Sequence, residues 1–174
     1  FGLSISSGAA WDAVNEIRKY PALDLRGVHA HIGSQIFNLT GHIESAKVLI
    51  EFLARYRDEF GTELPELDLG GGFGISYLES DSPNSTAIIM KTIHEVVTTS
   101  CAAASLNVPK ISIEPGRAII GPSMFTLYEV GTTKEVNLEN NKTRNYVSVD
   151  GGMSDNIRPS LYGEVYTEIG RAHV

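Results

Sequence analysis

Apolar residues recur at helical spacing in three stretches within the first two thirds of the chain. The clearest is 43–56, where apolar side chains fall every three or four residues until Gly61, a residue type that commonly closes a helix. Two further stretches, 7–19 and 85–106, show the same spacing. The pattern therefore predicts three helices.

Between and after these helices lie three short segments in which side chains alternate in direction. They are 25–32, 66–69 and 110–113, and each ends in polar or glycine-rich residues. Strands that alternate with helices are typical of parallel βα units in an α/β fold. Both a barrel and an open sheet of this kind bind ligands at the carboxyl ends of their strands, so we expect the functional residues there.

The alternation changes after about residue 120. The segments 124–131 and 144–150 read as strands with only a polar loop between them. We predict an α/β domain over 1–120 and the beginning of an all-β domain over 121–167. The last residues, 168–174, resemble a translated sequencing adapter and are expected to be a non-native tail, and the start at Phe1 suggests that the chain begins inside a domain.

Composition narrows the classes of partner. The chain is 42% hydrophobic and 20% charged with a net charge of −7, which indicates a folded protein and offers no basic cluster for nucleic acid. No apolar run is long enough to cross a bilayer, so we expect a soluble cytoplasmic protein. The single cysteine, Cys101, excludes an internal disulfide and is predicted to be a buried thiol without a chemical role.

A glycine turn, Gly70-Gly71-Gly72, follows the second predicted strand. Glycines allow positive φ and let several backbone N–H groups approach one anion, so a phosphate is the natural ligand. The turn lacks the third glycine of the dinucleotide-binding fingerprint. A tight turn without a ligand explains the glycines equally well.

The third predicted strand ends in Glu114-Pro115-Gly116-Arg117. Arg117 can bind a carboxylate or a phosphate, and Glu114 can bind a ring nitrogen that must stay protonated. A Glu–Arg ion pair that closes the turn is the simpler alternative.

The first strand ends in His31 and Ser34, an imidazole that can lie against an aromatic ring and a hydroxyl that can donate to a phosphate oxygen. His29 points to the same side of the strand as His31, which is unusual for an apolar core. A metal site is disfavoured because no acidic residue stands at suitable spacing in the sequence.

A fourth motif, Asp150-Gly151-Gly152-Met153-Ser154-Asp155-Asn156, precedes Arg158 and Tyr162. If this loop folds back over the strand ends, Arg158 and Tyr162 can together hold a substrate carboxylate. Otherwise they are ordinary surface residues of a glycine turn.

The order of these motifs resembles that of the diaminopimelate decarboxylases, which belong to the alanine-racemase-like, fold-type III class of pyridoxal-phosphate enzymes. The resemblance covers residues 1 to about 167 and rests on His-Ile-Gly-Ser, Leu-Gly-Gly-Gly, Glu-Pro-Gly-Arg and Arg-Pro-Ser-Leu-Tyr in that order. It implies an eight-stranded (β/α)8 TIM barrel followed by a β-sheet domain. It also implies decarboxylation of meso-2,6-diaminopimelate to L-lysine by a cytoplasmic homodimer.

The resemblance assigns the cofactor, pyridoxal 5'-phosphate, to strand-end residues. It implies that His31 stacks on the pyridine ring, that Ser34 lies near the phosphate and that Glu114 binds the ring nitrogen, which makes Glu114 and His31 the catalytic residues. The backbone donors to the phosphate would be Gly71, Gly72 and Gly116.

The resemblance also assigns the substrate. It implies that Arg117, which is counted with the cofactor-binding residues too, joins Arg158 and Tyr162 around the carboxylate that is not removed. The Schiff-base lysine is expected before Phe1 and a cysteine segment from the partner subunit beyond Thr167, so the chain is expected to be an internal fragment. No metal is implied.

Three other interpretations stay open. The protein could decarboxylate arginine, ornithine or a carboxylated polyamine, although a clamp for a distal carboxylate would not serve such a substrate. It could be a non-catalytic pyridoxal-phosphate-binding barrel, which the all-β segment disfavours. The isolated chain could also be inactive, because part of a barrel leaves open sheet edges.

Overall fold

The computed structural model describes residues 2–170 and separates the chain into two compact units. The first comprises 1–74 and 83–118, and the second comprises 75–82 and 119–174. The predicted tail at 168–174, with His173, lies largely outside the described residues. Within the described part, no helix combines the length and the apolar character that a membrane span requires.

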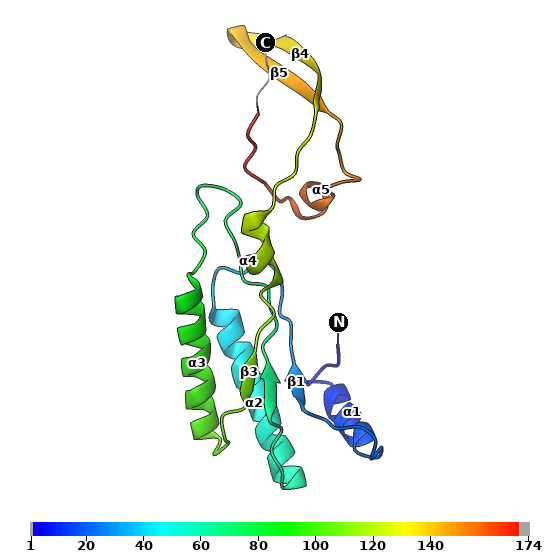
Figure 1. Cartoon of the computed structure of the whole chain (residues 1–174), viewed down its shortest axis with the longest axis vertical. Helices are drawn as coiled ribbons and strands as arrows, with labels where there is room; N and C mark the ends of the chain where they lie inside the picture. The colour runs from blue at the N-terminus through cyan, green and yellow to red at the C-terminus, as the bar shows by residue number, and fades with distance from the viewer. Residues whose placement is uncertain (1, 171–174) are drawn as a thin grey trace. The chain divides into compact units, whose positions relative to one another are not determined.

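The first unit is a parallel α/β unit, as the sequence predicts. Its sheet has the order β1-β2-β3 and consists of β1 (Gly27–His29), β2 (Glu66–Asp68) and β3 (Lys110–Ser112). Its long helices are α1 (Ala9–Ile17), α2 (Thr40–Phe60) and α3 (Thr86–Ala103), and α2 and α3 pack side by side (Figure 1). The strands are shorter than predicted, but the alternation of strand and helix is confirmed.

Local signals in the sequence set the ends of the two longest helices. Gly61 closes α2 in the left-handed conformation with φ 68°, and its N–H donates to the Arg57 carbonyl. Ser85 begins α3, where its side chain accepts a hydrogen bond from the Ile88 N–H. The Arg57 guanidinium also donates to the carbonyl of Ala104 at the end of α3, which ties the two helix ends together.

The strand register divides the sheet into an apolar and a polar face. Val28, Leu67 and Ile111 are paired neighbours, and Leu67, with 0% of its surface exposed, packs in the core with the inner faces of α2 and α3. The next paired row therefore projects to the opposite face of the sheet, because successive side chains alternate. This polar row is His29, Asp68 and Ser112.

The second unit contains an antiparallel ribbon of β4 (Val130–Leu138) and β5 (Lys142–Val149). A short 3-10 turn, Glu139–Asn141, joins the strands and places Asn140 and Asn141 at positive φ. The predicted strand at 124–131 is wrong for most of its length, since β4 begins only at Val130 and continues to Leu138. The polar loop predicted around Asn137 to Lys142 contains the actual turn at 139–141. The apolar residues of 124–129 have no ladder partner, whereas the polar residues of 132–138 pair with β5.

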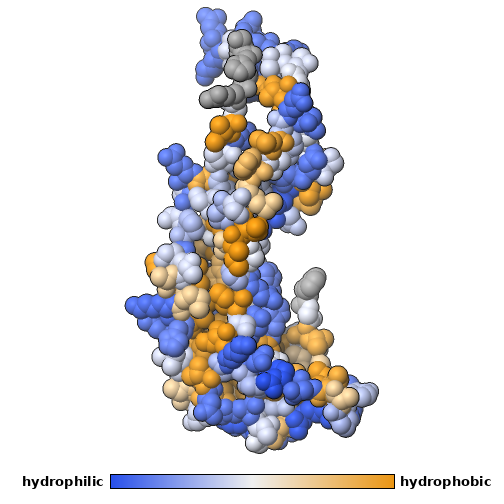
Figure 2. Space-filling model, in the orientation of Figure 1, coloured by the Kyte–Doolittle hydropathy of each residue, from blue (hydrophilic) through white to orange (hydrophobic). Residues whose placement is uncertain are grey.

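Two short helices were not predicted. Helix α4 (Gly116–Ile120) follows the Glu-Pro-Gly turn, and α5 (Arg158–Tyr162) replaces the predicted loop around Arg158. Among the described residues of the second unit none is buried, and Phe125 and Leu127 are each 81% exposed. Figure 2 shows apolar side chains on the visible surface of the molecule.

Candidate functional site

The carboxyl ends of the three strands of the first unit form a rim that hydrogen bonds extend beyond the strands themselves. The Ala30 N–H donates to the Asp68 carbonyl at 3.2 Å, and the Glu114 N–H donates to the Gly70 carbonyl at 2.7 Å. The segments after β1, β2 and β3 therefore stay side by side past the last strand residue. This rim carries the predicted residues His31, Gly71 and Glu114.

The glycine turn at this rim leaves no room for side chains. A Cβ on Gly71 would lie 2.0 Å from the Glu114 carbonyl oxygen, and a Cβ on Gly72 would lie 2.2 Å from the Gly33 carbonyl oxygen. Gly72 also has φ 87°, which L side chains rarely adopt. The glycines are therefore required by the close approach of the three strand ends.

The carbonyl groups of the turn are all engaged by the protein. Besides the bond from Glu114 to Gly70, the Gly71 carbonyl accepts from the His42 ring at 3.0 Å and the Gly72 carbonyl accepts from the Ile36 N–H at 2.8 Å. These bonds come from a helix and from the segment after β1. Together they fix the orientation of successive peptide groups.

The N–H groups of the glycine turn differ in whether they have a hydrogen-bond acceptor within the described residues. The Gly70 N–H donates to Asp68 Oδ1 at 2.8 Å, and the Gly71 N–H points to His31 Nδ1 at 3.4 Å. The Gly72 N–H has no hydrogen-bond partner within residues 2–170. It is a fixed donor that an anion at the rim can use.

Two side chains of the predicted phosphate site also meet. An Arg117 Nη2–H donates to Ser34 Oγ at 2.8 Å, which joins the end of β1 to the turn after β3. A guanidinium next to a hydroxyl is a suitable pair for a phosphate or carboxylate. The Gly116 N–H donates to the Glu114 carbonyl at 2.8 Å, so in this structure that N–H serves the turn, and its predicted role toward phosphate stays a prediction.

Glu114 lies with two residues of the polar row of the sheet. His29 Nε2 and Glu114 Oε2 are 3.2 Å apart, and ligand atoms of His29, Asp68 and Glu114 all lie within 4.8 Å of one another. The sequence shows no acidic residue at suitable spacing from the histidines, but the fold brings Asp68 and Glu114 from other strands to His29, so this argument against a metal site does not hold. Sequence spacing along one segment could not show this.

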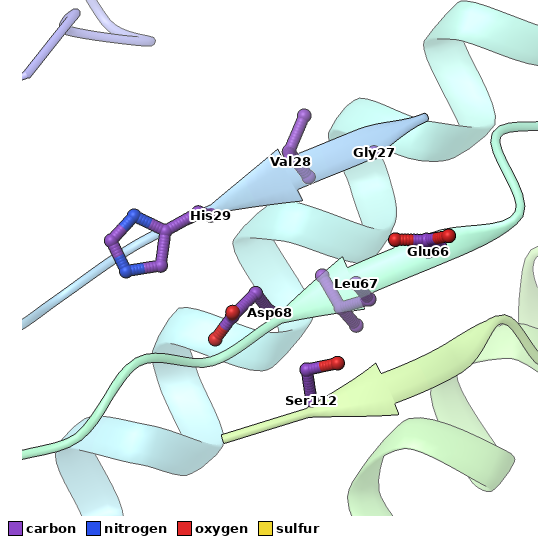
Figure 3. Close-up of a pocket in the computed structure, with 7 residues that line it drawn as sticks. All are labelled: Gly27, Val28, His29, Glu66, Leu67, Asp68 and Ser112. Carbon is purple, nitrogen blue, oxygen red and sulfur yellow. The ribbon is translucent and has the colours of Figure 1, made fainter. Parts of the chain in front are cut away.

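The polar row borders an open depression of about 210 Å³ on the sheet. Figure 3 shows His29 and Asp68 at the carboxyl ends of β1 and β2, next to Ser112 at the end of β3. The side chains of His29 and Glu114 are 49% and 55% exposed, respectively. Both groups are thus accessible to a ligand.

In the second unit, Arg158 and Tyr162 lie on α5 in contact with each other. The guanidinium carbon of Arg158 is 5.1 Å from the centre of the Tyr162 ring, and Arg158 Nη2 binds Glu164 Oε1 at 2.6 Å. The hydrogen bond to Glu164 raises the pKa of the Arg158 guanidinium above its ordinary value. The guanidinium is therefore already arranged to bind one carboxylate.

Sequence reasoning missed His42 and Glu164. His42 stands beside the apolar stripe of α2 and Glu164 follows a glycine, and neither position belongs to a recognisable motif. Their roles arise from contacts with Gly71 and Arg158, which a single sequence does not display.

Residues 1–121 match the family model described as pyridoxal-dependent decarboxylase, pyridoxal binding domain. The chain is 46% identical over 166 residues to diaminopimelate decarboxylase of Corynebacterium efficiens, covering 95% of this chain and 36% of that protein. It is 49% identical over 170 residues to the Mycobacterium tuberculosis protein of the same name, covering 95% and 38%. The chain thus spans little more than a third of these relatives.

Among solved structures, the chain is similar to diaminopimelate decarboxylase from M. jannaschii in co-complex with L-lysine. The TM-score is 0.83 at 28% sequence identity, and the match covers 96% of this chain and 37% of that one. The similarity therefore includes residues of both compact units.

Proposed function

This chain belongs to the family of pyridoxal-dependent decarboxylases, and on that premise we propose that the complete protein containing it decarboxylates meso-2,6-diaminopimelate to L-lysine. Relatives with this name share 46% and 49% of aligned residues with the chain. A similar solved structure holds L-lysine, the product of that reaction. The homodimer and the cytoplasmic location stay predictions.

The observation that carries the proposal is the rim itself, where the glycine turn with a free backbone donor lies beside the backbone of Glu114, whose side chain is a carboxylate. The Gly72 N–H is free within the described residues, and the Glu114 carbonyl oxygen lies 2.0 Å from the position that a Cβ of Gly71 would take. A phosphate needs such donors, and a pyridine nitrogen needs an acceptor such as the Glu114 carboxylate. The residues therefore fit pyridoxal 5'-phosphate.

In this proposal the chain supplies orientation and charge. Pyridoxal phosphate, when bound, supplies a ring that withdraws electrons from the carbon that loses carbon dioxide. Glu114 accepts a hydrogen bond from the protonated ring nitrogen and keeps the proton there. His29 Nε2 meets one oxygen of that carboxylate, which leaves the other oxygen for the ring.

His31 and Ser34 have separate roles in the same proposal. The His31 ring would stack on the cofactor ring, and because its Nδ1 faces the Gly71 N–H, its own hydrogen would lie on Nε2. Ser34 and Arg117 bind the phosphate from the ends of two strands, together with the N–H groups of the predicted glycines. These contacts orient the reacting groups in advance, so less rotational and translational freedom is lost on the way to the transition state.

Arg158 and Tyr162 bind the distal carboxylate of the substrate. The ion pair with Glu164 is compatible with this role, because it shows that the guanidinium accommodates a carboxylate at 2.6 Å. A carboxylate clamp selects diaminopimelate over substrates that end in an amine or a guanidinium.

The first test replaces Glu114 by Gln in the complete protein. We expect turnover to fall by about a hundredfold or more, because an amide does not stabilise the protonated ring nitrogen, while pyridoxal-phosphate content stays unchanged. Glu59→Gln, an exposed change on α2, is the control. Unaltered turnover in Glu114→Gln would remove Glu114 from the mechanism.

The second test concerns the substrate. Arg158→Ala should cost about 2 to 4 kcal/mol in kcat/KM on diaminopimelate, the value of a charge-assisted contact, and leave the cofactor content unchanged. Steady-state assays on diaminopimelate and arginine measure both effects. Equal wild-type activity on arginine and diaminopimelate, or full activity of Arg158→Ala, would contradict the substrate assignment.

A further inference from the structure

His42 is the one buried polar side chain among the described residues, with 2% of its surface exposed. It lies in the first turn of α2, and its ring stacks on Phe73 with centroids 4.6 Å apart and planes inclined by 10°. Its Nε2 is 3.0 Å from the Gly71 carbonyl oxygen. Its Nδ1 is buried and has no partner within residues 2–170.

These contacts determine which ring nitrogen of His42 carries the hydrogen. A carbonyl oxygen only accepts hydrogen bonds, so the hydrogen of His42 must lie on Nε2. Nδ1 then presents an unpaired lone pair in the core, an unfavourable arrangement. Phenylalanine would keep the stack on Phe73 and remove the unpaired nitrogen, but it would leave the buried Gly71 carbonyl without its donor. Packing alone therefore does not explain the imidazole, but its bond to Gly71 does.

The bond to Gly71 determines where the next N–H points. The peptide between Gly71 and Gly72 is trans, so its C=O and N–H point in opposite directions. Since His42 holds the C=O on the side of α2, the Gly72 N–H is directed away from α2. This is the N–H that has no partner within the described residues.

A peptide with glycine on both sides turns easily, because no Cβ restricts either neighbour. Without an anchor, the Gly71–Gly72 peptide could rotate and withdraw its N–H from an anion. We propose that His42 is a positioning residue that locks this peptide so that the Gly72 N–H serves the cofactor phosphate. The inference rests on the proposed function and adds a residue that lies outside every motif of the site.

The experiment uses the complete protein and three variants. His42→Phe keeps the aromatic ring but removes the donor, and His42→Gln places an amide N–H at a similar reach. His94→Phe, on the exposed side of α3, is the matched control. Pyridoxal-phosphate affinity is measured on the cofactor-free protein. The amide signal of Gly72 and the phosphorus signal of the bound cofactor are followed by NMR, and the unfolding temperature of each cofactor-free variant is recorded.

We expect His42→Phe to bind pyridoxal phosphate about tenfold more weakly, the effect of one lost hydrogen bond, and to stay folded with a lower unfolding temperature, because the buried Gly71 carbonyl loses its donor. The Gly72 amide signal, which should move when the cofactor binds the wild type, should move much less in His42→Phe. His42→Gln should restore both properties, and His94→Phe should resemble the wild type.

Wild-type affinity and a wild-type Gly72 response in His42→Phe would overturn the inference while leaving the proposed function intact. A wild type that binds no pyridoxal phosphate would overturn the proposed function and the inference with it. If His42→Phe does not fold, His42→Gln decides. A folded Gln variant with the Gly72 response supports positioning, and one without it refutes the role.

Discussion

The two compact units of this chain differ in how much they bury. All the buried apolar side chains of the described residues, such as Leu67, Phe73 and Val97, lie in the first unit, where α2 and α3 cover the sheet. The second unit exposes apolar residues along its ribbon and before it, including Phe125 and Tyr146. A two-stranded ribbon alone is at best marginally stable. The first unit therefore has its own core, and the second needs further surface to pack against.

The candidate site residues of the two units also differ in how tightly the protein holds them. At the rim of the first unit, backbone atoms approach so closely that Gly71 admits no side chain. In the second unit, Arg158 is held by a partly exposed ion pair with Glu164. The proposed cofactor site is thus held by close backbone contacts, whereas the proposed substrate clamp depends on side chains that can exchange partners.

The largest effect should come from Gly71→Ala. Its methyl group would overlap the Glu114 carbonyl oxygen at 2.0 Å, so the strand ends must separate. We expect a loss of more than about 4 kcal/mol in the free energy of unfolding, or no folded protein. Amide hydrogen exchange at Leu67 and Leu69 measures the opening of β2 in the complete protein.

Gly116→Ala is the matched control for this change, because nothing lies within 4 Å of its would-be Cβ. It should alter the stability by less than about 0.5 kcal/mol. Equal destabilisation by the two alanines would show that glycine is needed at the rim for a reason other than close approach.

A second, smaller effect separates the cores of the two units. Leu67→Ala removes a side chain that is 0% exposed and should cost about 3 kcal/mol, whereas Leu127→Ala removes one that is 81% exposed. If nothing covers Leu127 in the complete protein, that change should cost less than about 0.5 kcal/mol. Urea unfolding of both variants gives the comparison. A large loss for Leu127→Ala would mean that it is buried in the complete protein.

Glu164→Gln should have a modest effect on stability. The Arg158–Glu164 pair has side chains 32% and 18% exposed, and the free energy of unfolding should fall by no more than about 1 kcal/mol. Glu139→Gln, in the exposed turn between β4 and β5, is the comparison variant. Thermal unfolding measures both. A loss well above that of a partly exposed pair would contradict the view that the clamp is adaptable.

The smallest effect concerns Cys101, which is 0% exposed on α3. Burial raises the pKa of its thiol, and the negative charge of Glu63 adds to this. The neutral thiol thus favours the folded state. Its contribution to stability is complete below the ordinary thiol pKa and is lost as the pH rises through the raised value.

Alkylation of Cys101 checks this prediction. Because the reactive thiolate is suppressed and the sulfur is buried, iodoacetamide at pH 8.5 should label the folded protein about tenfold or more slowly than the urea-unfolded chain. Mass spectrometry of the peptide that carries Cys101 gives the rates. Similar rates in both states would show that α3 opens readily.

Most of the first unit could be predicted from the sequence, because its signals are local. The helical stripe that ends at Gly61 and the glycines after β2 each reflect conformation within a few residues. The strand ends could be recognised as the rim for the same reason. The ribbon was harder, since the apolar residues before Val130 suggested a strand while pairing with β5 selected the more polar segment that follows.

The contacts that complete the site were beyond sequence reasoning. The pairing of His29 with Glu114 joins residues 85 positions apart, and that of His42 with the Gly71 carbonyl joins residues 29 apart. Nothing in either local sequence specifies its partner. Such contacts follow from strand register and helix packing, which become visible only in three dimensions.

The strand order β1-β2-β3 also has a consequence for synthesis of the protein. Strand β2 pairs with β1, and β3 pairs with β2. During translation each of these two strands therefore emerges from the ribosome after the strand with which it pairs. Helix α2 can pack on β1 and β2 before α3 has been made. The first unit is thus suited to assembly in the direction of synthesis, one βα layer at a time, with little waiting for distant segments.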